Sequence, residues 1–418
     1  MDYFTIEGGS ELQGEINIKG AKNSILPIIA CCIMIKEEVV LRTCPRLNDI
    51  DSMLKIINSC GGVAKYENDN IIINCKDFLP EKIDTKFTCL LRASLFVLGP
   101  MLSMYKRACV CFPGGCEIGQ RPIDLHIAGL KSLGVSCNTC SGIIECDGYA
   151  MKNGEVFLDF PSVGATENIM MASVLSEGRT IIYNSAKEPE VCDLANFINS
   201  MGGKVSGAGT DKIIIDGVKS LRGGTYTPIK DRIVTGTYLI AGAMKGKEVI
   251  LNGVSLSQVY PLVQKLIATN AKIIVDKNRV IVRKSHNRRA VKRTETQPYP
   301  GFPTDLQPQL TTYLSSANGC SVMVENLFEN RFNYITQLQK MGADITVKDR
   351  VVIIKGVKFL CGAQLYAKDL RGGAALILAG IDAYGFSEVY GVEHIDRGYD
   401  KIECDLSTIG AKIKRIKT

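Results

Sequence analysis

The segment Ile198-Asn-Ser-Met-Gly-Gly-Lys-Val205 joins an apolar helical pattern to a strand signal through a glycine turn. Related segments begin at Ile57, Leu130, Leu266, Leu338 and Leu406. Their turn residues recur about every 67 to 72 positions, at Gly62, Gly134, Gly203, Asn270, Gly342 and Gly410. Glycine, or asparagine in one copy, is what a left-handed cap at a helix end requires. The repeated segment therefore predicts a helix, a tight turn and a short strand pair, and a β-branched strand signal follows most of the turns.

The number of copies predicts the domain organisation. A chain of 418 residues is too long for one ordinary core, so two domains of three units each are expected. Helical patterns open the units, as at 21–27 and 370–377, and β-branched strand signals follow, as at 180–183 and 248–251. This alternation predicts an α/β fold with two lobes, and ligands generally bind between lobes.

Composition narrows the classes of partner. The net charge of +7 is mild, which suits small anionic substrates and does not indicate nucleic acid. One dense basic run, 283–293, lacks interleaved aromatic residues, and a solvated loop or hairpin is favoured there over a polyanion site. The longest apolar run, 25–35, is shorter than the roughly 20 residues that span a bilayer. The first residues do not resemble a signal peptide.

The 16 cysteines indicate a reducing compartment, so a cytoplasmic protein is expected. Most of them should be small apolar fillers, and Cys109 and Cys111 are interpreted as strand packing. Cys137 and Cys140 form a CxxC pattern without a second pair at ligand spacing. The pattern is interpreted as turn chemistry near a strand, and no metal site is expected.

One cysteine lies in a different setting, Pro113-Gly-Gly-Cys116-Glu-Ile-Gly-Gln-Arg121-Pro-Ile-Asp124-Leu-His126. The glycines allow the backbone to approach a ligand closely, and Pro122 suits the first position of a helix. Cys116 and Arg121 would then precede a helix N-terminus, where anions bind and thiol pKa values fall. The pattern predicts a reactive cysteine beside an anion site, with a structural cysteine equally open on spacing alone.

Cationic residues near the starts of the repeats form a second candidate set. They are Lys22, Arg92, Arg121, Arg331, Arg371 and Arg397. Singly, such charges, like Asp231 and Asp369, are more often solvated groups or helix caps. Together they could form a clamp for a phosphorylated substrate, because guanidinium groups bind phosphate and carboxylate in bidentate fashion. No Walker motif and no GxGxxG after a strand is present, so ATP and dinucleotides are not expected.

Several motifs in order resemble the UDP-N-acetylglucosamine 1-carboxyvinyltransferases, a family of enolpyruvyl transferases, over the whole chain. The motifs lie at 21–23, 113–126, 162–168, 188–190, 231–232, 302–305, 328–332 and 394–399. The resemblance implies two inside-out α/β barrel domains, each of three βαβαββ repeats, with an active-site cleft between them. One domain would be 21–229, and the other 1–20 plus 230–418.

The implied reaction moves the enolpyruvyl group of phosphoenolpyruvate to the 3′-hydroxyl of UDP-N-acetylglucosamine and releases phosphate. By resemblance, Cys116 is the acid and can hold phosphoenolpyruvate covalently, Asp305 is the candidate base, and Lys22, Arg121 and Arg397 bind phosphoenolpyruvate. The implied nucleotide-sugar contacts are Asn23, Arg92, Arg121, Pro122, Ile123, Asp124, Leu125, Ser162, Val163, Gly164, Asp305 and Leu327. Arg331 and Arg371 complete the substrate-binding set. Neither a cofactor nor a metal is implied. The expected partners are the two small substrates, without nucleic acid or membrane, and a monomer is expected.

Some positions depart from the family pattern: Glu117 after the cysteine, Val234, Tyr334, and the pair Gly372-Gly373. Two other functions stay open. The first is 3-phosphoshikimate 1-carboxyvinyltransferase, which shares the implied fold but lacks the cysteine loop. The second is a non-catalytic relative that binds nucleotide sugar and regulates cell-wall synthesis.

Overall fold

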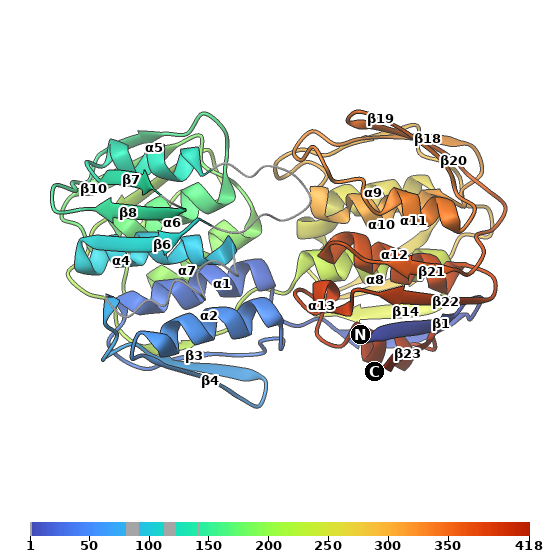
Figure 1. Ribbon diagram of the computed structural model, residues 1–418, viewed down its shortest axis with the longest axis horizontal. Helices are drawn as coiled ribbons and strands as arrows, with labels where there is room; N and C mark the ends of the chain where they lie inside the picture. The colour runs from blue at the N-terminus through green and yellow to red at the C-terminus, as the bar shows by residue number, and fades with distance from the viewer. Residues whose placement is uncertain (1, 81–91, 113–122, 141) are drawn as a thin grey trace. The chain divides into compact units, whose positions relative to one another are not determined.

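A computed structural model describes residues 2–80, 92–112, 123–140 and 142–418 (Figure 1). These residues divide into two compact units. One unit comprises 2–18 and 230–418, and the other comprises the described residues between 19 and 229. Each unit has its own hydrophobic core.

The 19–229 unit contains three sheets among its described residues, ordered β13-β3-β5-β4, β11-β12-β10-β9 and β6-β8-β7. Its strands are β3 (Val39–Leu41), β4 (Val63–Glu67), β5 (Asn70–Asn74), β6 (Arg107–Cys111), β7 (Ser136–Cys140), β8 (Ile143–Asp147), β9 (Glu155–Phe157), β10 (Arg179–Tyr183), β11 (Val205–Ser206), β12 (Lys212–Asp216) and β13 (Gly224–Tyr226). Its helices are α1 (Lys22–Cys31), α2 (Asn48–Ser59), α4 (Leu98–Tyr105), α5 (Asp124–Ser132), α6 (Val163–Ser173) and α7 (Pro189–Ser200), with 3₁₀ turns η1 (Cys32–Met34) and η3 (Arg92–Val97).

The other unit contains sheets ordered β21-β22-β1-β23, β15-β16-β14-β2 and β17-β18-β20-β19. Its strands are β1 (Tyr3–Glu7), β2 (Leu12–Asn17), β14 (Gly246–Asn252), β15 (Lys272–Asp276), β16 (Arg279–Arg283), β17 (Arg293–Glu295), β18 (Cys320–Val324), β19 (Asp344–Lys348), β20 (Val351–Lys355), β21 (Gln364–Tyr366), β22 (Phe386–Tyr390) and β23 (Lys412–Ile416). Its helices are α8 (Arg232–Lys245), α9 (Tyr260–Ala268), α10 (Gln307–Leu314), α11 (Ile335–Lys340), α12 (Leu370–Asp382), α13 (Val392–Ile395) and α14 (Ile402–Thr408), with 3₁₀ turns η4 (Leu256–Val259) and η5 (Thr304–Leu306).

The sheets share one connectivity. In each four-stranded sheet one edge strand runs parallel to its neighbour and the remaining pairs are antiparallel, as in β13, β3, β5 and β4. The described part of the β6-β8-β7 sheet contains the antiparallel portion of the same pattern. The repeated turns of the sequence therefore correspond to repeated sheets.

The turn positions need one correction. Gly134, Asn270, Gly342 and Gly410 have positive φ, as predicted, but in the two Gly-Gly turns the positive φ belongs to the first glycine, Gly61 or Gly202. The second glycine is required for a different reason. A Cβ at Gly62 would lie 2.7 Å from Ile57 Cγ2, and one at Gly203 would lie 2.3 Å from Ile198 Cγ2. These two glycines permit the strand to leave close to the preceding helix.

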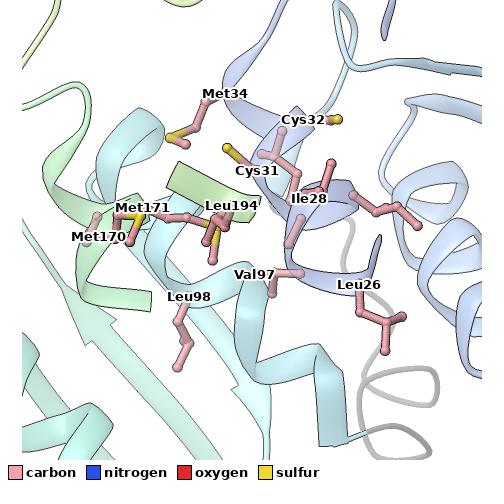
Figure 2. Close-up of a cluster of buried hydrophobic side chains, with 14 of the residues drawn as sticks. Leu26, Ile28, Cys31, Cys32, Met34, Val97, Leu98, Met170, Met171 and Leu194 are labelled. Carbon is pink, nitrogen blue, oxygen red and sulfur yellow. The ribbon is translucent and has the colours of Figure 1, made fainter. Parts of the chain in front are cut away.

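Helices form the centre of each core. Every residue of α6 from Ala165 to Ser173 is buried, and α4 packs against α6 while α10 packs against α12 (Figure 1). Figure 2 shows side chains from several helices meeting in the 19–229 unit. The labelled residues are Leu26, Ile28, Cys31, Cys32, Met34, Val97, Leu98, Met170, Met171 and Leu194. Cys31 and Cys32 are buried in this hydrophobic cluster, and burial raises the pKa of both thiols.

The basic run 283–293 begins at the end of β16 and continues as the connection to β17. Arg283 pairs with Glu248, Lys284 pairs with Glu11, and the Arg288 guanidinium lies 3.1 Å from Asp382 Oδ2. Arg288 also donates to the Met244 carbonyl at 3.2 Å. These charges therefore take part in ion pairs of the fold.

Candidate active site

Asp305 is held between two buried arginines. Its Oδ1 accepts a hydrogen bond from Arg331 Nη2 at 2.7 Å, and its Oδ2 lies 3.2 Å from Arg371 Nε and 3.1 Å from Arg371 Nη2. The arginine side chains are 2% and 4% exposed, whereas that of Asp305 is 27% exposed. Two guanidinium groups favour the charged carboxylate, and a reactant can still reach it from solvent. The structure thus brings together three of the predicted site residues.

The helix that carries Arg371 is held by its N-cap. Asp369 Oδ1 accepts from the backbone N–H groups of Arg371 and Gly372, at 3.0 and 2.9 Å. Burial opposes the charge of Arg371, but the negative charge of Asp305 keeps the arginine pKa above its usual value. Asp231 caps α8 in the same way, with its Oδ1 2.8 Å from the Ile233 nitrogen. The alternative interpretation of these aspartates as helix caps is confirmed.

Each arginine has one buried N–H donor without an acceptor among the described residues. Arg331 Nε and Arg371 Nη1 are buried and have no hydrogen-bond partner among the described residues. A buried N–H group without an acceptor is costly, and an anionic ligand would supply one. An anion bound beside the Asp305 carboxylate would give these donors an acceptor.

A residue that sequence reasoning missed supports this site. Glu325, at the end of β18, is fully buried and accepts from Thr304 Oγ1 at 2.8 Å and from the Leu327 nitrogen at 2.9 Å. It thereby positions the residue before Asp305 and the half-buried Leu327. Nothing in the local pattern distinguishes this glutamate from a solvated charge at a strand end.

Two departures from the family pattern are explained by packing. Tyr334 is buried, and its hydroxyl accepts from Gln307 Nε2 at 3.0 Å. A Cβ at Gly372 would lie 2.7 Å from Asp369 Oδ2, and one at Gly373 would lie 2.6 Å from Ile395 Cγ1. The glycine pair therefore allows the cap and α13 to approach α12. Val234 is half-buried, and its backbone nitrogen donates to Asp231. Nothing in the structure explains why valine stands at this position instead of a carboxylate.

In the 19–229 unit, Lys22 opens α1 and pairs with Asp49 of α2. The Nζ–Oδ2 distance is 3.0 Å, and the side chains are 10% and 8% exposed. Asp49 compensates the charge of a lysine that the fold almost encloses. Sequence reasoning missed Asp49, which lies 27 residues away in no recognisable motif. Asn23 follows Lys22 and is half-buried.

Ser162 caps α6, with its Oγ accepting from the Ala165 nitrogen at 3.4 Å, and Val163 and Gly164 form the first turn. Gly164 faces His126, because a Cβ there would lie 3.0 Å from His126 Nε2. These three half-buried residues leave helix N–H groups at a site suited to an anion or a polar ligand.

His126 itself is oriented by Asn168. The Asn168 Oδ1 accepts from the Gly99 nitrogen, and its Nδ2 donates to the Leu95 carbonyl, each at 3.0 Å. These contacts assign the amide orientation, so Nδ2 also donates to His126 Nδ1 at 2.9 Å. The neutral imidazole then carries its proton on Nε2, on the side of Gly164.

The remaining predicted site residues have these places. Cys116, Arg121 and Pro122, as well as Glu117, lie outside the described residues. Arg92 is the first residue of η3, and its side chain is outside the described set. Ile123 is the buried N-cap of α5, which Asp124 and Leu125 open, so the helix begins two residues after the expected Pro122. Arg397 is half-buried in the segment between α13 and α14.

Two interpretations of cysteines need correction. Cys111 is buried, but Cys109 is exposed and does not serve as strand packing. Cys137 and Cys140 both belong to strand β7, so the CxxC pattern forms no turn. Within the described ranges there is no group of three or more histidine, cysteine, aspartate or glutamate side chains suited to a metal ion. No helix in the described part of the chain has the length and apolar character needed to cross a bilayer.

Comparison with known proteins assigns the chain to a family. The model of the EPSP synthase family, 3-phosphoshikimate 1-carboxyvinyltransferase, matches residues 6–406. The chain belongs to this family of enolpyruvyl transferases. UDP-N-acetylglucosamine 1-carboxyvinyltransferase 2 of Caldanaerobacter subterraneus is 46% identical over 416 residues, with complete coverage of both chains. The Thermotoga maritima UDP-N-acetylglucosamine 1-carboxyvinyltransferase is 44% identical over 420 residues, covering 100% of this chain and 99% of the relative.

Solved structures of enolpyruvyl transferases share the fold. NikO from Streptomyces tendae has a TM-score of 0.89 at 21% identity, and covers 100% of this chain and 99% of its own. An EPSP synthase from Acinetobacter baumannii has a TM-score of 0.76 at 16% identity, with complete coverage of both chains.

Proposed function

We propose that this chain transfers the enolpyruvyl group of phosphoenolpyruvate to the 3′-hydroxyl of UDP-N-acetylglucosamine and releases phosphate. This reaction opens peptidoglycan synthesis. The observation that carries the proposal is the position of the Asp305 carboxylate between two buried arginines. Each arginine has one N–H donor without an acceptor among the described residues. Full-length relatives at 42–46% identity are named for this activity.

The chemistry requires an acid for C3 of phosphoenolpyruvate, a base for the sugar hydroxyl and cations for phosphate and carboxylate. Asp305 is the proposed base, because its carboxylate combines charge with exposure. Arg331 and Arg371 hold that carboxylate and offer donors to substrate oxygens. Lys22, Arg121 and Arg397 would bind phosphoenolpyruvate, and Cys116 would be the acid.

The nucleotide sugar is proposed to bind the α6 N-terminus at Ser162, Val163 and Gly164, where helix N–H groups suit a polar ligand. Asn23, Arg92, Ile123–Leu125 and Leu327 are proposed as further contacts. Each unit is proposed to be an inside-out α/β barrel of three repeats, which the buried helices and repeated sheets support. The cysteine content supports a reducing, cytoplasmic compartment for the reaction.

The runner-up activity is transfer to shikimate 3-phosphate, after which the matched family model is named. Sequence similarity disfavours it, because the solved EPSP synthases are 15–16% identical to this chain. The assay that separates the two measures phosphate release from phosphoenolpyruvate with either acceptor. We expect release with UDP-N-acetylglucosamine and none with shikimate 3-phosphate. Release with shikimate 3-phosphate alone, or with neither acceptor, would overturn the proposal.

The role of Asp305 has its own test in the same assay. Asp305→Asn should lower turnover by roughly a hundred- to ten-thousand-fold, the usual worth of general base assistance, while binding of UDP-N-acetylglucosamine persists in titration calorimetry. Asp344→Asn is the matched control, because Asp344 is an exposed aspartate on β19 and is not one of the predicted site residues. Wild-type turnover in Asp305→Asn would exclude this aspartate as the base.

A further inference from the structure

Two cysteines face each other across neighbouring strands in the 19–229 unit. Cys137 of β7 and Cys146 of β8 are direct partners in the antiparallel register. Their sulfur atoms lie 3.1 Å apart, with the Cys146 S–H donating to Cys137. Directly opposed residues of an antiparallel pair have Cα atoms about 4.5 to 5.5 Å apart, and a disulfide accepts about 4.4 to 6.8 Å. The backbone is therefore already in a position that a disulfide can use.

The sequence pattern points to a different partner, which the strand excludes. Cys137 and Cys140 are three positions apart in β7, and side chains of a strand alternate between its faces. Cys140 thus lies on the opposite face, about 10 Å along the strand from Cys137. Cys109 of β6 pairs in register with Glu145, not with Cys146. The geometry selects the Cys137–Cys146 pair.

The two thiols differ in their exposure and in the direction in which their pKa is shifted. Cys137 is half-buried on the edge strand of its sheet, whereas Cys146 is 5% exposed. The S–H from Cys146 and the positive charge of Lys131 lower the pKa of Cys137, although burial acts in the other direction. The shared hydrogen bond and burial raise the pKa of Cys146. Cys137 is therefore the more exposed thiol of the pair and the one whose pKa is lowered.

We propose that Cys137 and Cys146 form an oxidisable dithiol, a modification site that closes as an intramolecular disulfide. The oxidant is a low-molecular-weight disulfide such as glutathione disulfide. The Cys137 thiolate attacks one sulfur of the oxidant, forming a mixed disulfide and releasing one thiolate. Cys146 then loses its proton and attacks Cys137, forming the internal disulfide and releasing the second thiolate. The dithiol loses two electrons, and the oxidant is reduced to two thiols.

The site can be tested by mapping disulfides in the whole protein. The reduced protein is exposed to glutathione disulfide, free thiols are blocked with N-ethylmaleimide, and the chain is digested without reductant. Trypsin leaves Cys137, Cys140 and Cys146 in one peptide, since no lysine or arginine lies between Lys131 and Lys152. A second protease that cuts after Glu145 separates Cys146 from the other two. We expect these two fragments to stay linked until reductant is added.

Variants assign the linkage. Cys137→Ser and Cys146→Ala should abolish the linked fragments, while the matched control Cys140→Ser should form them at the wild-type rate. The wild-type map decides the question even if a variant folds poorly. A disulfide between Cys137 and Cys140, or glutathione retained on Cys137 without loss to Cys146, would overturn the proposal. So would free Cys137 and Cys146 under conditions that oxidise other cysteines of the chain.

Discussion

Glu167 is a carboxyl group in the interior of the 19–229 unit. It has no exposed surface, and neither of its oxygens has a hydrogen-bond partner among the described residues. Burial raises its pKa well above the usual value, and the negative charges of Glu190 and Glu188 act in the same direction. A neutral, protonated Glu167 is therefore the form that the fold favours.

This residue predicts a pH dependence of stability. Because the folded pKa is raised, the stabilising effect of the bound proton is complete below the ordinary carboxyl pKa and is lost as pH rises toward the folded value. Glu167→Gln removes that titration. We expect the variant to melt above the wild type at about pH 8, with the difference shrinking toward about pH 5. Thermal melts across this range measure the difference in melting temperature. Glu145→Gln is the control, because Glu145 is an exposed carboxylate on β8. A constant difference across the range would contradict the prediction.

At the scale of elements, the two glycines of the turn after α7 are required for two different reasons. Gly202 has a φ of 98°, and a Cβ there would make only an ordinary contact with Arg222 Nε at 4.0 Å, so glycine is required at this position for its backbone conformation. Gly203 has an ordinary φ, but a Cβ would meet Ile198, so the demand on it is steric. The equivalent turn after α9 uses Asn270, with a φ of 70°.

The two demands predict different tolerances. Gly202→Ala should lower the free energy of unfolding by about 1 to 2 kcal/mol, because alanine is disfavoured in the left-handed conformation. Gly202→Asn should lower it by less, because asparagine adopts this conformation more readily. Gly203→Ala should destabilise through overpacking, typically by about 1 to 3 kcal/mol, and Gly203→Asn should not improve on it. Urea unfolding of the four variants gives the comparison. If asparagine is no better than alanine at position 202, backbone conformation is not the constraint there.

At the scale of the whole molecule, the two hydrophobic cores have no buried residue in common among those that the structure describes. Leu98 and Leu310 are both fully buried, one in each core. Truncating either to alanine should leave a cavity and cost about 2 to 5 kcal/mol in its own unit. Hydrogen exchange should then show lost protection chiefly in 19–229 for Leu98→Ala and in 230–418 for Leu310→Ala. Equal loss across both units in each variant would indicate a single cooperative unit.

Much of the element pattern could be predicted from the sequence, because its causes are local. The helix ends at Gly134, Asn270, Gly342 and Gly410 follow from backbone conformations that few residues adopt. The strand signals at 180–183 and 248–251 lie within β10 and β14. Errors arose where two residues of one type compete, as in the Gly-Gly turns, or where a motif ignores strand geometry, as in the CxxC of β7.

The candidate site could be predicted as a set of residues but not as a set of contacts. Sequence alone selected Asp305, Arg331 and Arg371, and it did not show that they form one network. Arg371 lies 66 positions from Asp305, and Lys22 lies 27 positions from Asp49. Glu325, Asp49 and Cys146 were missed because each acquires its role from a partner on another element. Local spacing determines helices, strands and turns, whereas packing decides which distant side chains share a low-dielectric interior and so pair their charges, protons and sulfur atoms.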